Sequence, residues 1–350
     1  MKSLDPAYLD ALRLTADHGS TLKALGEYRG KQELYRRQTP QILDVLKQAA
    51  VVESAESSNR LEGITAPVER IEALVQRSTA PRDRSEQEIA GYRDALNLLH
   101  ESAGEMAFSV NVILQLHTML FRYAPSPGGR WKMAQNEIVE RNTDGSVQRI
   151  RFVPPSPVAT PPLMQGLTES YAKAIDMRRE PLIVVPLAIL DFLCIHPFSD
   201  GNGRMSRLLT AQLLYHFDYE VGRFISLERI FEESKESYYE TLDASSRRWH
   251  EGKHDVFPWM TYFWGGMLRA YRQFEERVGT IRTGRGAKGD LVEQAIARRV
   301  GPFAISDIEG DCPGVTRDWI RMVLRRLKAE GRIAPIGKGR GAKWLRTDKW

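Results

Sequence analysis

One twelve-residue run between two apolar segments constrains this chain more than any other feature. His196–Arg207 reads HPFSDGNGRMSR, which groups a histidine, a carboxylate, a glycine-flanked asparagine and two arginines. Apolar residues dominate positions 182–193 before the run and 208–214 after it, and this pattern predicts largely buried helices on both sides. We therefore expect a helix, a polar glycine-rich loop, and a second helix that begins near Arg204.

This arrangement suits a phosphate ligand. The first N–H groups of a helix lack partners within the helix, and together with the helix dipole they bind anions. Gly201 and Gly203 flank Asn202 and let the backbone approach a ligand closely. Arg204 and Arg207 are three residues apart, so both can face one side of the new helix and offer bidentate donors to phosphate oxygens.

Two further residues of the run can carry chemistry. Asp200 supplies a hard oxygen ligand of the kind that Mg²⁺ prefers beside phosphates. His196 is the group in this run that takes up a proton most readily near neutral pH. Together with the phosphate-binding groups, these residues indicate a functional site rather than an ordinary structural loop.

The run also matches the signature HPFx(D/E)GNGRxxR of the Fic family at every specified position. The chain therefore resembles Fic proteins, which transfer AMP from ATP to a protein hydroxyl and release pyrophosphate. The resemblance implies a mainly helical Fic fold with a β-hairpin flap, ATP as a substrate and Mg²⁺ as the cofactor. The acceptor would be a Ser, Thr or Tyr hydroxyl of a target protein or of the chain itself.

The same resemblance gives each residue of the run a role. His196 would be the general base that deprotonates the target hydroxyl, and Asp200 would be the Mg²⁺ ligand. Arg204 would neutralise the departing pyrophosphate, and Arg207 would hold the γ-phosphate. The other residues of the run that the resemblance places against ATP are Phe198, Gly201, Asn202 and Gly203.

Alternatives on the same site stay open. A related branch, resembling Doc, carries Lys at the position of Gly203 and phosphorylates its target, so Gly203 favours AMP transfer. The alternatives are a phosphotransferase, an enzyme that removes AMP from its target, and a nucleotide-sensing, DNA-binding regulator.

A second motif lies far upstream. Residues 58–63 read SNRLEG and resemble the inhibitory pattern (S/T)xxxE(G/N) of Fic proteins. Ser58 and Glu62 are four residues apart, hence neighbours on one helix face, and Gly63 would end that helix. The resemblance implies that Glu62 pairs with Arg207, fills the space of the γ-phosphate and misplaces ATP.

A β-hairpin is expected before the motif. Strand-like segments at 132–139 and 147–153 flank the turn signal Asp144-Gly145. In Fic proteins the equivalent flap pairs with an extended segment of the target, and its inner strand borders the nucleotide. The resemblance adds four candidate ATP contacts, which are Ile138, Val139, Tyr238 and Tyr239.

The length of 350 residues predicts more than one domain. We expect an N-terminal helical region at 1–105, with the inhibitory helix near 41–63, a Fic catalytic core at 106–280 and a separate domain at 281–350. A capping-box pattern at Ser85–Glu88 predicts the start of one further helix in the first region.

The last seventy residues are basic. They hold sixteen Lys or Arg against eight Asp or Glu, so they carry +8 while residues 1–280 carry −3 of the net +5. Their pattern predicts three helices and two strands, which resembles a winged helix-turn-helix domain. Such a domain can bind DNA or dock a protein. The candidate DNA contacts are Arg317, Arg321 and Arg325 on the third helix and Lys338, Arg340 and Lys343 on the wing.

The remaining composition excludes several classes of protein. No apolar run reaches the ~20 residues of a membrane span, and the N-terminus lacks the apolar core of a signal peptide. Cys194 and Cys312 are too few and too far apart in sequence to suggest a disulfide framework or a zinc site. We expect a cytoplasmic protein without a membrane partner, which pairs as a homodimer if it follows other Fic proteins.

Overall fold

The computed structural model describes residues 3–38, 40–76, 79–141, 146–282, 287–297, 299, 301–312, 315–337 and 343–347. The chain forms two compact units. The first contains Met1–Gln32 and Ala49–Tyr271, and the second contains Glu33–Gln48 and Arg272–Trp350. The boundary near residue 105 that the sequence suggested falls inside the first unit, where the N-terminal helices pack with the motif helices.

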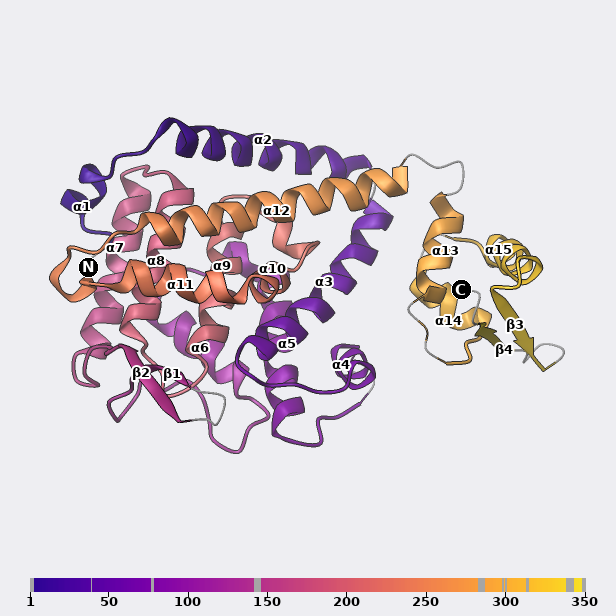
Figure 1. Cartoon of the computed structure of the whole chain (residues 1–350), viewed down its shortest axis with the longest axis horizontal. Coiled ribbons are helices and arrows are strands. Elements are labelled where there is room, and N and C mark those ends of the chain that lie inside the picture. The colour runs from indigo at the N-terminus through magenta and orange to yellow at the C-terminus, as the bar shows by residue number, and fades with distance from the viewer. Residues whose placement is uncertain are drawn as a thin grey trace. The chain divides into compact units, whose positions relative to one another are not determined.

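The first unit consists of helices and one β-hairpin, which confirms the mainly helical fold class (Figure 1). The helices before and after the motif, α8 (Pro181–Ile195) and α9 (Asn202–Tyr215), are almost entirely buried. The two helices pack against each other. In addition, α8 packs against α7 (Thr160–Asp176), and α9 packs against α5 (Arg84–Ser102). The other helices that belong wholly or partly to this unit are α1 (Pro6–Ala11), α2 (Ala16–Gln38), α3 (Pro40–Leu61), α4 (Val68–Val75), η1 (Ala103–Glu105), α6 (Val110–Leu120), η2 (Val221–Arg223), α10 (Leu227–Glu233), α11 (Lys235–Ser246), η3 (Trp249–Glu251) and α12 (Phe257–Arg282).

A proline inside the most apolar helix explains how α12 is anchored on α8. Pro186 has no N–H, so the carbonyl of Leu182 loses its helical partner. The indole Nε1 of Trp264 donates to that carbonyl oxygen at 2.7 Å, and Trp259 Nε1 donates to the Pro186 carbonyl at 2.8 Å. A buried carbonyl without a partner is costly, and Trp264 removes that cost at Leu182, while Trp259 adds a second hydrogen bond from α12 to α8.

Two helix starts differ from the sequence-based expectation. The cap of α5 is Asp83, whose carboxylate accepts from the Glu86 N–H at 2.9 Å, so the capping box expected at Ser85 is wrong by two residues. The helix α9 begins at Asn202 and not near Arg204. Gly201 has a φ of 81°, which L side chains rarely adopt, and this tight turn lets the chain enter the helix at once.

The hairpin is shorter than the sequence suggested. β1 (Ile138–Arg141) pairs antiparallel with β2 (Val147–Phe152), with Ile138 opposite Phe152 and Val139 opposite Ile150. The expectation of a strand from Lys132 was wrong, because the polar groups of 132–136 bond to the backbone at 195–198 instead. The expected Asp144-Gly145 turn lies outside the described residues.

The second unit has its own core. It contains α13 (Ala287–Ala297), α14 (Ile305–Asp311), α15 (Arg317–Ala329) and a hairpin of β3 (Ile333–Ile336) and β4 (Lys343–Arg346). The order of three helices and two strands is the one predicted, and its identification as a winged helix stays a prediction. Lys338 and Arg340 lie outside the described residues. The buried side chains of this core include Val292, Ile296, Phe303, Ile308, Ile320, Leu324, Leu327 and Ile333.

Both cysteines are free and buried. Within the described ranges, no helix combines the length and the apolar character that crossing a membrane requires.

One glycine sets the distance between two helices that support the site. A Cβ on Gly91 of α5 would lie 2.0 Å from the carbonyl oxygen of Leu120, at the end of α6. We expect Gly91→Ala to lower the free energy of unfolding by about 1–3 kcal/mol, because backbone has to move to admit the methyl group. Urea unfolding measures this change.

Gly26→Ala is the matched control, since a Cβ at Gly26 in helix α2 meets nothing within 4 Å. Alanine is the better helix former, so this substitution should stabilise the protein by up to about 1 kcal/mol. Equal effects of the two substitutions would contradict the proposed close contact at Gly91.

Candidate active site

His196 ends α8 in a strained backbone conformation. Its φ of 48° and ψ of 60° lie in the left-handed region, which is uncommon for a residue with a side chain. Its Nδ1 lies 3.2 Å from the Leu193 carbonyl oxygen. A carbonyl only accepts, so Nδ1 carries the proton and Nε2 keeps the lone pair.

The environment keeps this imidazole neutral. Burial lowers the pKa of His196 to about 4, and the Lys132 cation adds to the effect. The hydrogen bond to Leu193 and the Glu62 carboxylate act in the opposite direction but are outweighed. At neutral pH the side chain is therefore an unprotonated base.

The loop after His196 is shaped by its own asparagine. Asn202 Oδ1 accepts from the Phe198 N–H at 2.9 Å, and Asn202 Nδ2 donates to the Phe198 carbonyl at 2.8 Å. His117 supports the loop from α6, with its Nε2 3.1 Å from the Asp200 carbonyl oxygen. The Asn202 side chain is thus engaged within the loop, which leaves the backbone N–H groups of the first turn of α9 for an anion.

Phe198 does not face a ligand with its side chain. The ring is fully buried and stacks on the His117 ring, with 3.6 Å between centroids. Its N–H and carbonyl are used by Asn202. We therefore assign Phe198 to the packing beneath the loop instead of the expected contact with ATP.

Arg204 is buried beneath the loop. Its Nη1 donates to Glu88 Oε2 at 2.5 Å and its Nη2 to Asp200 Oδ1 at 3.5 Å. The guanidinium also lies over the Phe121 ring, 5.3 Å from its centroid. Its Nε is buried without a hydrogen-bond partner among the described residues, so one donor remains for a ligand.

Arg207 is held by the end of α3. Its Nε donates to Ser58 Oγ, and its Nη2 donates to the Ser58 carbonyl and to Glu62 Oε1, each at 2.8 Å. The arginine side chain is 2% exposed and that of Glu62 is 32% exposed. Gly63 follows the helix with a φ of 79° and turns the chain away. The structure thus brings the two motifs together across about 150 residues of sequence.

Glu62 also lies directly over Gly203. A Cβ at position 203 would be 2.1 Å from Glu62 Oε1 and 3.3 Å from Arg207 Nη1. That Nη1 is buried and has no hydrogen-bond partner among the described residues. The carboxylate therefore occupies the space beside the first turn of α9, where anions bind.

These groups border a pocket of about 200 Å³. His196, Gly203, Arg207 and Glu62 line one part of it, and α8, α11 and the hairpin line the rest. Tyr239 also bonds to the end of α3, since its hydroxyl donates to the Leu61 carbonyl at 3.2 Å. Of the four additional candidate contacts, Ile138, Tyr238 and Tyr239 line this pocket, and Val139 is not among its lining residues.

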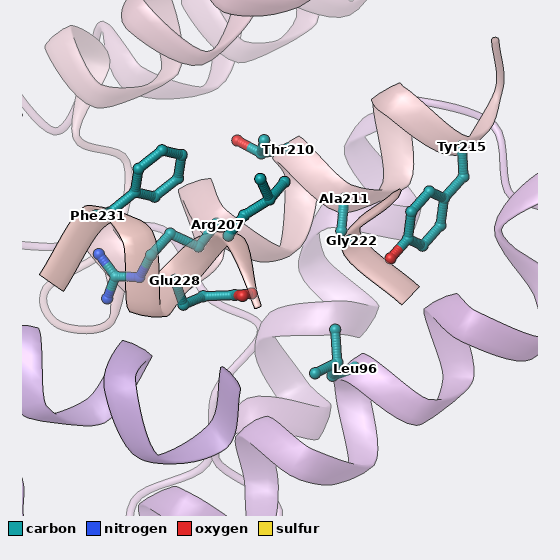
Figure 2. Close-up of a pocket in the computed structure, with 9 residues that line it drawn as sticks. Leu96, Arg207, Thr210, Ala211, Tyr215, Gly222, Glu228 and Phe231 are labelled. Carbon is teal, nitrogen blue, oxygen red and sulfur yellow. The ribbon is translucent and has the colours of Figure 1, made fainter. Parts of the chain in front are cut away.

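A small void lies behind Arg207 (Figure 2). It encloses about 10 Å³, space for one water molecule at most. Figure 2 shows the Arg207 side chain beside Glu228 and Phe231 of α10. The void is too small for a nucleotide, so the pocket on the His196 side is the candidate site.

Asp200 can offer one carboxylate to a metal ion. The side chain is 53% exposed, accepts from the Gly201 N–H at 2.6 Å and lies 3.6 Å from Arg84 Nη2. Across the described residues, no three His, Cys, Asp or Glu side chains form a metal-binding group. A Mg²⁺ ion here would take most ligands from phosphate and water, which is its usual mode of binding.

Several supporting residues escaped the sequence analysis. Glu88, His117, Lys132 and Asn136 carry no local motif that distinguishes them, because each acts through a contact far away in sequence. Asn59 lies inside the motif at residues 58–63, and its Oδ1 is 3.5 Å from Arg204 Nη1.

Comparison with known proteins agrees with this geometry. Residues 107–214 match the family model of the Fic/DOC family. "Protein adenylyltransferase Fic" of Nematostella vectensis is 24% identical over 197 residues, which are 54% of this chain and 42% of the relative. The protein of the same name from Drosophila willistoni is 27% identical over 45% of this chain and 31% of its own length. The chain thus spans less than half the length of these curated relatives.

Two crystal structures share the fold. A Fic family protein from Desulfovibrio desulfuricans G20 superposes with a TM-score of 0.63 at 19% identity, over 96% of this chain and 98% of its own. A Fic domain containing signaling protein from Bacteroides thetaiotaomicron VPI-5482 gives a TM-score of 0.61 at 20% identity, over 74% of this chain and 98% of its own.

The pKa of His196 predicts a loss of stability in acid. Its value of about 4 lies below the ~6.5 of an unfolded chain, so the unfolded state takes up the proton first as the pH falls. This contribution to stability is complete above pH ~6.5 and is lost towards pH ~4. Between pH 7 and pH 5, the wild type should lose about 1–2 kcal/mol more unfolding free energy than His196→Ala.

Urea unfolding of both proteins at the two pH values measures the difference. A comparison between pH 8 and pH 7 serves as the control, because His196 stays neutral in both states over most of that range. Equal losses in the two proteins between pH 7 and pH 5 would show that folding does not lower the pKa of His196.

Proposed function

The chain is a Fic family protein, and we propose that it is an AMP-transferase that moves AMP from ATP to a hydroxyl of a protein. One observation carries the proposal. A neutral, partly buried histidine lines the same pocket as Gly203 in the first turn of α9 and Arg207, whose buried Nη1 has no hydrogen-bond partner among the described residues. A base beside donors for phosphate oxygens is what transfer at phosphorus to a hydroxyl requires.

The reaction follows from these positions. His196 Nε2 takes the proton of the target hydroxyl while that oxygen attacks the α-phosphorus of ATP. The bond from the α-phosphorus to the oxygen that bridges to the β-phosphate breaks, and pyrophosphate leaves with its charge opposed by Arg204. The AMP stays on the target as a phosphodiester, and His196 later releases the proton to solvent. Positioning and charge stabilisation supply most of the rate.

Asp200 would hold a Mg²⁺ ion, which supplies charge neutralisation at the phosphates when bound. Its half-exposed carboxylate beside the loop fits an ion that shares one protein ligand with phosphate oxygens and water. Arg204, in contact with Asp200, would then act on the same phosphates from the buried side.

Gly203 supports AMP transfer over phosphotransfer. A side chain at this position would collide with the Glu62 carboxylate, so the Lys of the Doc-like branch is incompatible with this arrangement. An enzyme that removes AMP from its target would use the same residues. The mass added to or lost from a target protein distinguishes these three activities.

We also propose that Glu62 inhibits the enzyme. Its carboxylate takes the Arg207 Nη2 donor and fills the space over Gly203, so a γ-phosphate cannot bind Arg207 until Glu62 leaves. The target segment would pair with the flap formed by β1 and β2, where Val147 and Ile150 are exposed.

The test is intact-mass analysis after incubation with ATP and Mg²⁺. Glu62→Gly should increase AMP addition of +329 Da per site, the mass of AMP less water, by roughly 5–150-fold, the usual range of such coupling. Glu62→Gln keeps the bulk over Gly203 but loses the charge, so it should activate less. Adding His196→Ala to Glu62→Gly should remove the gain, since general-base assistance contributes ~10²–10⁴ in rate.

Arg207→Ala should not reproduce the activation, because it removes the partner of Glu62 and the proposed γ-phosphate ligand together. A Glu62→Gly protein no more active than wild type over a range of ATP concentrations would refute autoinhibition. The absence of any AMP adduct in all variants would refute the transferase assignment.

A second candidate function belongs to the C-terminal unit, which we propose binds duplex DNA through α15. This helix buries Ile320, Val323, Leu324 and Leu327 and exposes arginines on its other side. Arg317 pairs with Glu309 at 3.0 Å and Arg321 with Asp318 at 2.9 Å, both at the surface. Such pairs contribute little free energy, so phosphate can replace the carboxylates.

Replacing Arg317, Arg321 and Arg325 with Ala in the full chain should weaken DNA binding without changing AMP transfer. The slope of log K against log salt should become shallower by ~0.9 for each lost phosphate contact. Fluorescence anisotropy of a labelled duplex measures it, with Arg13, Arg247 and Arg248 replaced in the control. Equal losses in both triple variants, or no binding by wild type at low salt, would refute DNA recognition by α15.

A further inference from the structure

Four consecutive carbonyl groups around the catalytic histidine are bound by two residues from one short segment. Lys132 Nζ donates to the Ile195 carbonyl at 3.2 Å, and the Lys132 backbone N–H donates to Pro197 at 2.9 Å. Asn136 Nδ2 donates to the His196 carbonyl at 3.3 Å and to Phe198 at 3.0 Å. The two side chains are joined, because Lys132 Nζ also donates to Asn136 Oδ1 at 2.8 Å.

These bonds fall where the backbone is strained. His196 adopts left-handed dihedral angles, and such a conformation persists in a non-glycine residue only when its surroundings fix it. The α8 helix supplies one bond, from the His196 N–H to Phe192 at 2.9 Å. Every carbonyl from 195 to 198 is fixed from outside the helix by Lys132 or Asn136.

Lys132 is an unusual residue for this place. Its side chain is 2% exposed, and no ion pair of the described residues includes it. Its partners are neutral oxygens, those of Asn136 and of the Ile195 carbonyl. Burial lowers the pKa of Lys132 to about 8. A buried ammonium that pairs with no carboxylate has a free-energy cost, which suggests a role beyond packing.

We propose that Lys132 and Asn136 are positioning residues for His196. They fix the left-handed turn that aims the imidazole into the pocket, and the Lys132 cation disfavours its protonation. The catalytic part of this inference rests on the proposed AMP transfer, and the geometric part does not.

Other charged and titratable groups share the pocket with His196, and their influence must be separated from that of Lys132. They come from α8, the end of α3, β2, α9 and α11 and are Cys194, Glu62, Arg151, Arg207, Tyr238, Tyr239 and Asp243. Among them Glu62 raises the pKa of His196, in opposition to Lys132. The test therefore includes the Glu62→Gly background, in which this opposing charge is absent.

The experiment compares Lys132→Met, Lys132→Arg and Asn136→Asp in full-length protein. Lys132→Met removes the charge and the Nζ donors, whereas Lys132→Arg keeps the charge and replaces the Nζ donors with guanidinium N–H donors. Asn136→Asp keeps the shape and the acceptor for Lys132 but removes the two Nδ2 hydrogen bonds. Lys173→Met, at an exposed position of α7, is the matched control for loss of a lysine.

Two readouts separate positioning from mere stabilisation. The first is NMR titration of the His196 imidazole, which needs no substrate. We expect its pKa to rise in Lys132→Met and Asn136→Asp and to stay low in Lys132→Arg and Lys173→Met. The second is AMP transfer in the Glu62→Gly background. Here kcat should fall about 10–100-fold in the first two variants with KM for ATP nearly unchanged, because the base is misplaced and the phosphate site is intact.

The outcomes are distinct. An unchanged His196 titration and unchanged kcat in folded Lys132→Met and Asn136→Asp would overturn the proposal. If Lys132→Met does not fold, Asn136→Asp decides by the same criteria. If the pKa rises as expected but the Glu62→Gly parent transfers no AMP, the proposed function fails and the positioning of His196 by these two residues stands.

Discussion

Two guanidinium groups buried at the start of α9 organise the structure around them. Arg204 and Arg207 are 1% and 2% exposed, and a buried charge without compensation would strongly destabilise the fold. Their partners come from other helices: Glu88 lies on α5, and Ser58 lies on α3 with Glu62 just after its end. Helices α3 and α5 from the N-terminal region therefore contribute residues that contact the arginines of the candidate site.

The two arginines differ in how exchangeable their partners are. Glu88 is 3% exposed, so the Arg204–Glu88 pair is part of the fold and leaves only Nε for a ligand. Glu62 is 32% exposed and follows the end of its helix, so it can leave Arg207 at a smaller structural cost. Glu88 is thus a fixed counter-charge, whereas Glu62 is one that a phosphate group can replace. The proposed regulation, in which a γ-phosphate binds Arg207 only after Glu62 has left it, needs such a replaceable counter-charge.

Much of the fold and the centre of the site could be predicted from local sequence. The apolar runs on both sides of the motif predicted α8 and α9. The residues of 196–207 predicted that a base, a carboxylate and hydrogen-bond donors for phosphate lie close together at the start of a helix. The predictions that were wrong concern residues with more than one possible hydrogen-bond partner, and the local sequence does not decide between those partners. Asp83 and not Ser85 caps α5, and Lys132–Asn136 bond to a distant loop where a strand was expected. Phe198, read as a ligand contact, is fully buried against His117.

The sequence by itself determined which residues could carry chemistry, because a twelve-residue motif on one helix start brings its own groups together. It also linked Glu62 to Arg207 through a family resemblance. Only the tertiary structure decided the partners that tune those groups: Glu88 on Arg204, His117 under the loop, and Lys132 and Asn136 around His196. These contacts join residues from about 60 to 116 positions apart in the chain, and no local pattern records them, since burial and charge compensation arise only when the helices pack.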